Sequence, residues 1–423
     1  MHIKKLIKRI IVLTVFVITI LVLTGSPHVT DATDKYKVYC RIRIYNNAMF
    51  DTEHGVTRGK GTKDDPYVIE GWRIDASEDT GIFIEGTDAH FIIRNCLIEN
   101  GRDENVGIIL SSLKNGRVEN CVLRNNKYGI RVYNSSNIVI VRCTIYNSSA
   151  LTRWISLVEG GIEVDVSRNI TIADCKSYNN IGHGICLSST FDAIIINCEV
   201  YNNSYSGIKL KDGEASFLGM KLRFPPTNNT LIVNCKAYNN YEGISLLYST
   251  NNVIKDCELY GNSYGIRLLL SHNNTVTGCI IRNNQIGVKL DFAKDNLIYN
   301  NFFNNTKILV HGNFTLKAKN CEAFGAMFYP SKWNIEKHEG KNIVGGKYIG
   351  GNYWDDYNGT DIDDDGVGDR PYVIDEYSMD NYPLIKPKVL VEEEGKPSMW
   401  AIYSVPIILV SIIAAYLLIK HRR

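Results

Sequence analysis

The amino-acid sequence predicts an all-β fold, a right-handed parallel β-helix with three sheets and about 22 residues per coil. Two observations predict it. The first is that a glycine precedes an apolar–x–apolar triplet nine times along the chain. The second is that each glycine is followed, at a nearly constant distance, by a residue that we call the marker of the unit, which is cysteine in eight of the nine units. That distance is 14 or 15 residues in every unit but one, where it is 28 residues. The glycines are Gly81, Gly107, Gly129, Gly161, Gly184, Gly207, Gly243, Gly265 and Gly287. The markers are Cys96, Cys121, Cys143, Cys175, Cys198, Cys235, Cys257, Cys279 and Asn301.

Each unit holds three short runs of alternating apolar residues, separated by turns rich in Asn and Gly. Runs of this length are too short for helices and are typical of strands. A single strand cannot bury its apolar side alone, so we expect each unit to stack on the next, with parallel ladders about 4.8 Å apart. Parallel crossovers are right-handed in nearly all proteins, which gives the predicted hand. The Asn found four residues after most markers suits a left-handed turn conformation.

The marker cysteines are predicted to point inward and to form one stack of free thiols. Each shares its parity with an aliphatic residue two positions later, as Cys257 does with Leu259. In-register parallel neighbours lie about 4.8 Å apart, which exceeds the Cβ separation of about 3.8 Å that a disulfide prefers. We therefore favour a packing role over metal binding or redox chemistry. Cys186 differs, because its parity points outward, and the sequence suggests no role for it.

Both ends of the chain are strongly apolar. Residues 1–30 are typical of a signal peptide or signal anchor, and 399–419 are long enough for a transmembrane helix. Basic residues flank both segments, so the positive-inside rule predicts a cell-membrane protein, single-pass after signal cleavage, with its bulk outside the cell. The expected order is an N-terminal cap over 31–80, the β-helix over 81–320, a C-terminal cap over 321–388, a linker over 389–398, the transmembrane helix and a cytoplasmic tail over 420–423. Outside the two tails acidic residues outnumber basic ones, which argues against a nucleic-acid partner.

The repeat resembles the NosD-like family of β-helix proteins, also described as CASH domains. "GKGTKDDPYVIEGWRIDAS" (59–77) is similar to the N-terminal segment of archaeal members, and "GGNYWDDYNGTDIDDDGVGDRPYVIDEYSMDNYPL" (350–384) is similar to their C-terminal segment. The family consensus has Asn where this chain has the stacked Cys, and Asn301 keeps it. The resemblance implies the fold over about residues 59–385. Its members include a copper-site maturation protein that works with an ABC transporter, and epimerase-like relatives.

Three functions remain open on this evidence. The first is binding, with processing as a variant, of polysaccharide or glycan. The second is a NosD-like extracellular accessory of an ABC-type transporter or of a metal-site maturation system. The third is a structural cell-envelope protein. The scattered His residues and six Met residues form no copper-binding pattern.

The candidate binding face is the outward side of the Gly-led strands in the middle of the array. Insertions at 148–160 and 211–227 interrupt the repeat there, and insertions on one side of a solenoid often mark its binding surface. The outward positions between them are Arg131, Tyr133, Glu163, Asp165, Cys186, Ser188, Lys209 and Lys211, with His183 at the rim. The alternative is an ordinary solvated strand face with alternating charge.

Catalysis on this face is the weaker hypothesis. Glu163 and Asp165 stand two residues apart on one strand, so their Cα atoms should be about 6.6 Å apart, and they join His183 as the catalytic candidates. Such a pair would suit a polysaccharide lyase or a glycoside hydrolase. The neighbouring Arg and Lys side chains, however, should hold both acids ionised rather than raise one pKa. We therefore expect binding rather than catalysis.

Two further patterns suggest ligands. The first is a ladder of outward Tyr residues three positions after successive cysteines, of which Tyr178 and Tyr201 are the central candidates for contact with sugar rings. Its members are Tyr146, Tyr178, Tyr201, Tyr238 and Tyr260. Aromatic rings of this kind bind sugars or protein partners, but they also stabilise sheets by stacking on one another.

The second pattern is the acidic loop "TDIDDDGVGDRPY" (360–372), which resembles Ca²⁺-binding loops. Its expected ligands are the carboxylates of Asp361, Asp363, Asp365 and Asp369 and the backbone carbonyl of Val367. Tyr372 stands where an EF-hand has a bidentate acid, so the expected affinity is weak, on the order of 1 mM. The alternative is a solvated acidic turn. A bound Ca²⁺ would have a structural role in closing the C-terminal end of the solenoid.

Overall fold

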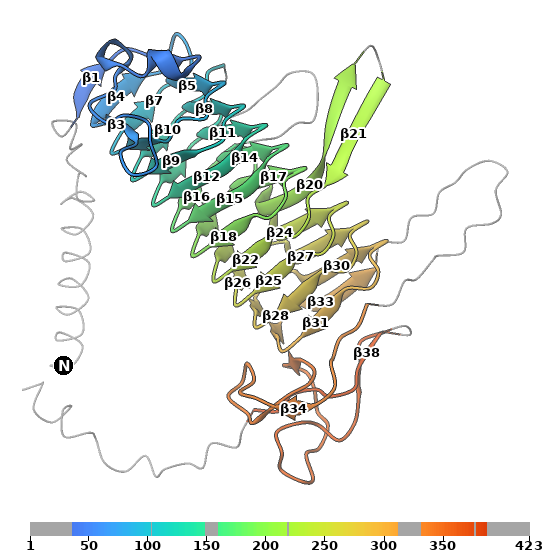
Figure 1. Ribbon diagram of the computed structural model, residues 1–423. Helices are drawn as coiled ribbons and strands as arrows, with labels where there is room; N and C mark the ends of the chain where they lie inside the picture. The colour runs from blue at the N-terminus through green and yellow to red at the C-terminus, as the bar shows by residue number, and fades with distance from the viewer. Residues whose placement is uncertain are drawn as a thin grey trace, which may run out of the picture. The chain divides into compact units, whose positions relative to one another are not determined.

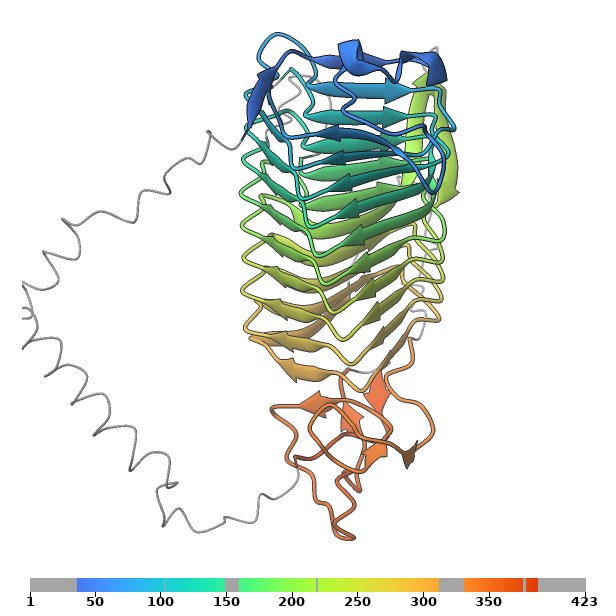
Figure 2. The same cartoon turned by 60° about the vertical axis from the view of Figure 1, so that its left-hand side comes forward.

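The computed structural model describes residues 36–102, 104–148, 160–217, 220–311, 331–375 and 378–386. These residues form a right-handed parallel β-helix of about ten turns with three sheets, as the sequence predicts. Each turn contributes one strand to each sheet, and each strand pairs in parallel with its counterpart in the next turn (Figure 1). A view turned by 60° shows the turns stacked in sequence order (Figure 2).

The first sheet carries the predicted Tyr ladder and is called the tyrosine sheet. Its order is β1 (Lys37–Tyr39), β4 (Trp72–Asp75), β7 (Leu97–Glu99), β10 (Val122–Arg124), β13 (Thr144–Tyr146), β16 (Lys176–Tyr178), β19 (Glu199–Tyr201), β23 (Lys236–Tyr238), β26 (Glu258–Tyr260), β29 (Ile280–Arg282), β32 (Phe302–Asn304) and β36 (Tyr353–Trp354).

The second sheet is the Gly-led sheet. Its order is β2 (Ile42–Ile44), β5 (Ile82–Glu85), β8 (Ile108–Ser111), β11 (Ile130–Tyr133), β14 (Ile162–Asp165), β17 (Ile185–Ser188), β20 (Ser206–Phe217), β24 (Glu242–Leu247), β27 (Tyr264–Leu269), β30 (Ile286–Asp291) and β33 (Lys307–His311). β20 continues past its neighbours and pairs antiparallel with β21 (Met220–Pro226), so the second insertion forms a hairpin (Figure 1).

The third sheet lies before the cysteines in each turn. Its order is β3 (Tyr67–Glu70), β6 (Phe91–Arg94), β9 (Gly116–Glu119), β12 (Ser136–Val141), β15 (Arg168–Ala173), β18 (Ile194–Ile196), β22 (Leu231–Val233), β25 (Val253–Lys255), β28 (Thr275–Thr277) and β31 (Leu297–Tyr299). The remaining elements are the short antiparallel pairs β34 (His338–Glu339) with β35 (Tyr348–Ile349) and β37 (Tyr372–Val373) with β38 (Met379–Asp380), and the 3₁₀ turns η2 (Asn47–Met49) and η3 (Thr52–His54).

The stacked cysteines behave as predicted. All eight marker cysteines are free and at most 2% exposed. Each thiol lies near a backbone carbonyl two residues earlier, as Cys198 Sγ does at 3.4 Å from the carbonyl oxygen of Ile196. Burial without basic neighbours makes such thiols inert packing groups. Cys186 points to the outer side of its sheet, yet it too is buried, at 1% exposure.

The turn that follows the tyrosine sheet is built on two consecutive Asn residues with different tasks. The first, such as Asn202 or Asn239, adopts a left-handed conformation with φ of 55°. The second points inward and hydrogen-bonds its counterpart in the next turn, with Nδ2 to Oδ1 distances of 2.8–3.3 Å. This ladder runs through Asn180, Asn203, Asn240, Asn262, Asn284 and Asn305. It satisfies buried amides that would otherwise destabilise the core, and the sequence analysis missed it.

The C-terminal end of the core is closed by aromatic side chains. β36 adds to the tyrosine sheet beside β32, which places Trp354 on Phe303 with ring centroids 4.7 Å apart. Trp333 contacts both rings, and Tyr372 stacks on the other side of Trp354 at 4.6 Å. The end of the solenoid is therefore sealed by packed rings rather than left as exposed strand edges.

The described residues contain no helix that is long and apolar enough to cross a membrane. Residues 1–30 and 399–419, for which the sequence predicts membrane insertion, lie outside the described residues. Those expectations therefore remain predictions.

Candidate functional site

The register of the Gly-led sheet brings the predicted site residues into two adjacent columns. Arg131 pairs with Glu163, and the same column continues through Cys186 to Lys209. The second column runs from Tyr133 through Asp165 and Ser188 to Lys211. Arg131 Nη2 lies 3.5 Å from Asp165 Oδ2.

The centre of this face is not the solvated strand surface that the sequence left open as an alternative. Glu163 is 1% exposed and Lys209 is 9% exposed. Charged side chains are rarely buried this deeply unless they are paired. Residues 149–159 of the first insertion, which the sequence places beside this face, lie outside the described residues.

A buried network of ion pairs extends the first column beyond the residues predicted from sequence. Lys209 Nζ donates to Ser245 Oγ at 2.7 Å and lies 3.7 Å from Glu242 Oε2. Arg267 bridges two acids, with Nη1 2.8 Å from Glu242 Oε1 and Nε 3.1 Å from Asp291 Oδ2. The register alone could have found Ser245 and Arg267, because both lie in line with Lys209.

Titration in this network is strongly perturbed. Burial, with help from Lys209 and Lys211, lowers the pKa of His183 to about 3, so its ring is neutral. Its Nδ1 accepts a hydrogen bond from the backbone N–H of Ser206 at 3.1 Å. Burial also lowers the pKa of Lys209, although the negative charge of Glu242 acts in the opposite direction and raises it. Burial alone would raise the pKa of Glu242, but Lys209, Ser206 and Arg267 outweigh it and lower that pKa to about 2.

The depressed pKa of Glu242 makes a prediction about pH. Its stabilising contribution is fully present above its ordinary pKa of 4.5 and is lost as the pH falls towards 2. The difference in unfolding free energy between the wild type and Glu242→Gln should therefore shrink by about 2 kcal/mol between pH 6 and pH 3. Urea unfolding of both proteins at each pH measures this difference, in which the titration of groups that do not interact with Glu242 cancels. A difference that stays constant with pH would show that Glu242 is not held ionised by its partners.

Two exposed tyrosines lie next to residues of the network, and a third lies on the same sheet. Tyr205 is 43% exposed, and its ring contacts His183 edge-on with centroids 5.8 Å apart. Tyr241 is 47% exposed, directly precedes Glu242, and donates its backbone N–H to the carbonyl of Tyr205. Tyr133, one of the predicted residues, is 43% exposed. Of these three, the sequence analysis missed Tyr205 and Tyr241, although each stands two residues before a Gly of the repeat.

The predicted Tyr ladder is present, with neighbouring ring centroids 4.8–5.1 Å apart and ring planes within 3° of parallel. Such close stacking covers the ring faces, so the inner members Tyr178 and Tyr201 offer only edges and hydroxyl groups to a ligand. Arg282 covers the outer face of Tyr260 at 4.8 Å. The ladder thus performs the stabilising role that the sequence left open, and ligand contact through its hydroxyl groups stays a prediction.

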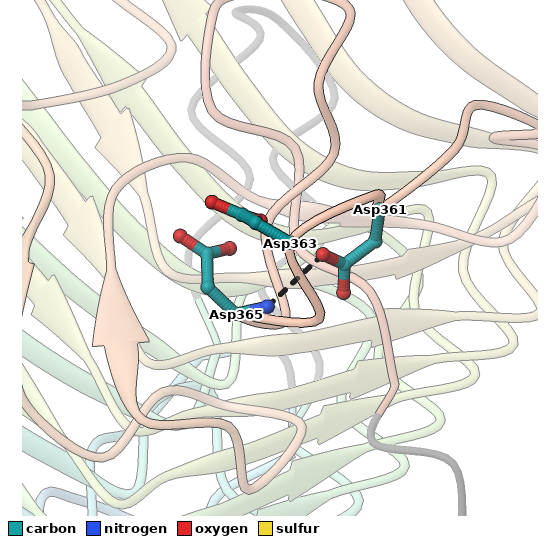
Figure 3. Close-up of side chains that lie close together, drawn as sticks. All are labelled: Asp361, Asp363 and Asp365. Carbon is teal, nitrogen blue, oxygen red and sulfur yellow. Dashed lines mark hydrogen bonds between the residues drawn. The ribbon is translucent and has the colours of Figure 1, made fainter.

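The acidic loop gathers three of its predicted ligands. Carboxylate oxygens of Asp361, Asp363 and Asp365 lie within 4.8 Å of one another (Figure 3). Asp361 accepts the backbone N–H groups of Asp365 and Gly366, at 3.0 and 2.9 Å, which closes the loop. Asp369 turns its carboxylate to the backbone N–H of Ile362, at 2.8 Å. Lys337 forms an ion pair with Asp365 and so offsets part of the negative charge.

The three-sheet solenoid and its buried ladders define a right-handed parallel β-helix protein. Two family models match the chain: "Right handed beta helix region" over residues 39–192 and 143–221, and "Periplasmic copper-binding protein (NosD)" over residues 219–359. The chain is therefore a right-handed parallel β-helix protein whose residues 219–359 match NosD, which confirms the resemblance seen in the sequence.

Several solved structures have a similar fold. The A-module of the Azotobacter vinelandii mannuronan C-5 epimerase AlgE6 is 16% identical, with a TM-score of 0.46, over 58% of this chain and 74% of that one. The periplasmic alginate epimerase AlgG is 16% identical, with a TM-score of 0.39, over 62% and 74%. The DFA-IIIase of Arthrobacter chlorophenolicus A6 is 12% identical, with a TM-score of 0.42, over 57% and 62%. Comparison with curated proteins finds no match.

Proposed function

We propose that this chain is a membrane-anchored extracellular protein that binds polysaccharide or glycan on the outer face of its Gly-led sheet. The observation that carries the proposal is the pair of buried, pKa-shifted charges of Lys209 and Glu242, with the neutral ring of His183, next to the exposed residues Tyr205 and Tyr241. Strongly shifted pKa values gather at functional sites more often than elsewhere. Aromatic faces beside charged and hydroxyl groups suit sugar rings, which are apolar on one side and polar at the edge.

Binding is proposed rather than catalysis. Glu163 is buried and Asp165 is ion-paired with Arg131, so the structure offers no clear division into a general acid and a nucleophile. Processing of the bound glycan, as a lyase or a hydrolase, would need an acid whose pKa is raised towards neutrality on this face. Glu242 has the opposite shift.

The second candidate function is the accessory role in a transporter or a metal-site maturation system, which the NosD match at residues 219–359 favours. Copper sites in proteins use mainly sulfur and imidazole donors. Among the described residues, the one group of three side chains with ligand atoms within 4.8 Å of one another is the carboxylate set Asp361, Asp363 and Asp365. Hard carboxylates suit Ca²⁺ better than copper, so the described residues do not fit a copper site.

The binding test uses the full-length chain purified in detergent. Polysaccharide pull-down and glycan arrays should detect a ligand, and the double variant Tyr205→Ala with Tyr241→Ala should weaken binding by at least about tenfold. Tyr45→Ala is the matched control, because Tyr45 is similarly exposed, at 49%, near the N-terminal end of the solenoid. A reducing-sugar assay on the same ligands would reveal processing. Absence of any glycan ligand would favour the transporter-accessory or structural alternatives.

For the acidic loop we propose a weak structural Ca²⁺ site. Adding 10 mM CaCl₂ to EDTA-treated protein should raise the melting temperature by about 2 °C, which is what binding with an affinity of about 1 mM supplies. Asp363→Asn should abolish this rise, because Asp363 belongs to the cluster and its carboxylate has no hydrogen bond to the described residues that the change would break. Asp364→Asn removes the same charge from the same loop outside the cluster and should keep the rise. Equal melting curves with EDTA and with Ca²⁺ would mean a solvated acidic turn.

A further inference from the structure

A polar hollow lies at the turn between the tyrosine sheet and the Gly-led sheet. It measures about 520 Å³ and extends over four successive turns of the solenoid. This volume falls within the range of about 300–1,000 Å³ that is typical of ligand sites. Its lining consists of Asn239, Asn240, Gly261, Asn262, Ser263, Asn283, Asn284, Gln285 and Thr306. The lining has no charged residue and no large apolar one. The hollow therefore differs in chemistry from the ion-pair network described above.

The hollow exists because one repeat position lacks its side chain. Gly261 occupies the place that Asn holds in the other turns, between Asn239 and Asn283. Its φ of 67° is the left-handed conformation that Asn239 and Asn283 adopt at 55° and 56°. A Cβ atom at Gly261 would stand 2.5 Å from Asn239 Oδ1, so even a small side chain would intrude on the hollow. The conformation does not require glycine here, since Asn adopts it in neighbouring turns.

The floor and the walls of the hollow differ in their hydrogen bonding. Asn240, Asn262 and Asn284 form the floor, and their Nδ2 groups are already engaged in the inner ladder. Asn239 and Asn283 form the walls, are exposed, and have no side-chain hydrogen bond within the described part of the chain. Each of these two amides can donate and accept at once. Ser263, Gln285 and Thr306 add further donors and acceptors.

We propose that this hollow binds an uncharged sugar residue of an oligosaccharide. Hydroxyl groups both donate and accept, so they match paired amides, whereas a uronic acid or a phosphorylated ligand would find no cation in the lining. Tyr241 follows Asn240 directly and is 47% exposed, but it is not among the lining residues, so the variants below test the hollow apart from it. This inference rests on the proposed function, because it identifies one sugar class that the protein would take, but it concerns a place separate from the ion-pair network.

The test fills the hollow without disturbing the turn. Gly261→Asn restores the residue that the repeat has elsewhere and should keep the melting temperature. Gly278→Asn is the matched control: Gly278 is the exception in another Asn-rich turn, its φ is 69°, and its Cβ would likewise meet a side-chain oxygen of the preceding turn, Asp256 Oδ1. Asn283→Asp is the second variant, because it keeps the size and the turn but removes the donor.

Isothermal titration of the full-length chain should use cellohexaose, mannohexaose, maltohexaose and hexa-N-acetylchitohexaose, with a galacturonate hexamer as the anionic probe. We expect at least one neutral probe to bind the wild type and Gly278→Asn equally, and to bind Gly261→Asn and Asn283→Asp about tenfold or more weakly, the effect of losing one or two hydrogen bonds.

Unchanged affinity in Gly261→Asn and Asn283→Asp would overturn the inference. If Tyr205→Ala with Tyr241→Ala still abolished glycan binding, the proposed function would nevertheless stand. Binding of the anionic probe alone would also overturn the inference while supporting a glycan-binding protein. No heat with any of the five probes would overturn the inference too, and polysaccharide pull-down would then decide the proposed function separately.

Discussion

Trp354→Ala is expected to lower the free energy of unfolding by about 3–5 kcal/mol, the usual cost of truncating a buried aromatic side chain. Trp354 is 1% exposed and stacks between Phe303 and Tyr372. Its Nε1 also donates to Asp380 Oδ2 at 2.9 Å, deep in the cap. Removing the indole therefore opens a cavity at the end of the core and removes a donor from a buried carboxylate. Burial already raises the pKa of Asp380 to about 6.

Trp354→Phe separates the two effects. It keeps a ring between Phe303 and Tyr372 but loses the hydrogen bond, so it should cost about 1–3 kcal/mol, less than the alanine variant. Urea unfolding followed by tryptophan fluorescence and by far-ultraviolet circular dichroism measures both variants. If Trp354→Ala unfolds at the wild-type urea concentration, the rings do not close the core. The C-terminal segment would then contribute nothing to the stability of the solenoid.

Lys209→Met should destabilise the protein by about 3 kcal/mol, because removing one partner of a buried ion pair leaves a buried charge short of compensation. Glu242 would keep Arg267 at 2.8 Å, which places the cost at the lower end of the range for such pairs. Lys236→Met is the matched control. Lys236 forms a similar pair with Glu258 at 3.5 Å, but its side chain is 59% exposed, so its loss should cost less than about 1 kcal/mol.

A double-mutant cycle with Glu242→Gln completes this test. If the two groups compensate each other, the double variant should cost clearly less than the sum of the single variants. Additive costs would mean that Lys209 is held by Ser245 and by its packing rather than by Glu242. The same variants, screened for glycan binding, would show whether the network also matters for the ligand.

The fold could be predicted from the sequence because a 22-residue period is visible in residue types that the coil constrains tightly. Cys is a small, easily buried residue that packs in the inward stack at Cys198, and Asn tolerates the left-handed turn at Asn202. The inner Asn ladder was missed because the sequence analysis assigned a role only to the first Asn of each pair, four residues after the marker, and none to the second. The pattern shows that two amides recur, but not that one of them points inward.

The candidate site was only partly predictable. Parity placed Glu163 and Lys209 on the outer side of the Gly-led sheet, and the register confirms it. Parity says nothing about what covers that side, so the burial of both residues was not foreseen. Glu242 and Arg267 were missed because the search ended at the second insertion, although the sheet continues beyond it with the same register.

The turns that contain Asn240, Asn262 and Asn284 repeat at intervals of 22 residues, and each contacts its neighbours through the same amide and strand ladders. Any two adjacent turns of this set therefore present matching surfaces to each other. If one whole turn were lost or duplicated, the newly adjacent turns would make the same contacts that neighbouring turns make now. Unequal recombination could therefore lengthen or shorten the solenoid by whole turns. An insertion of one residue within a strand, by contrast, would turn the following side chains of that strand to the opposite face.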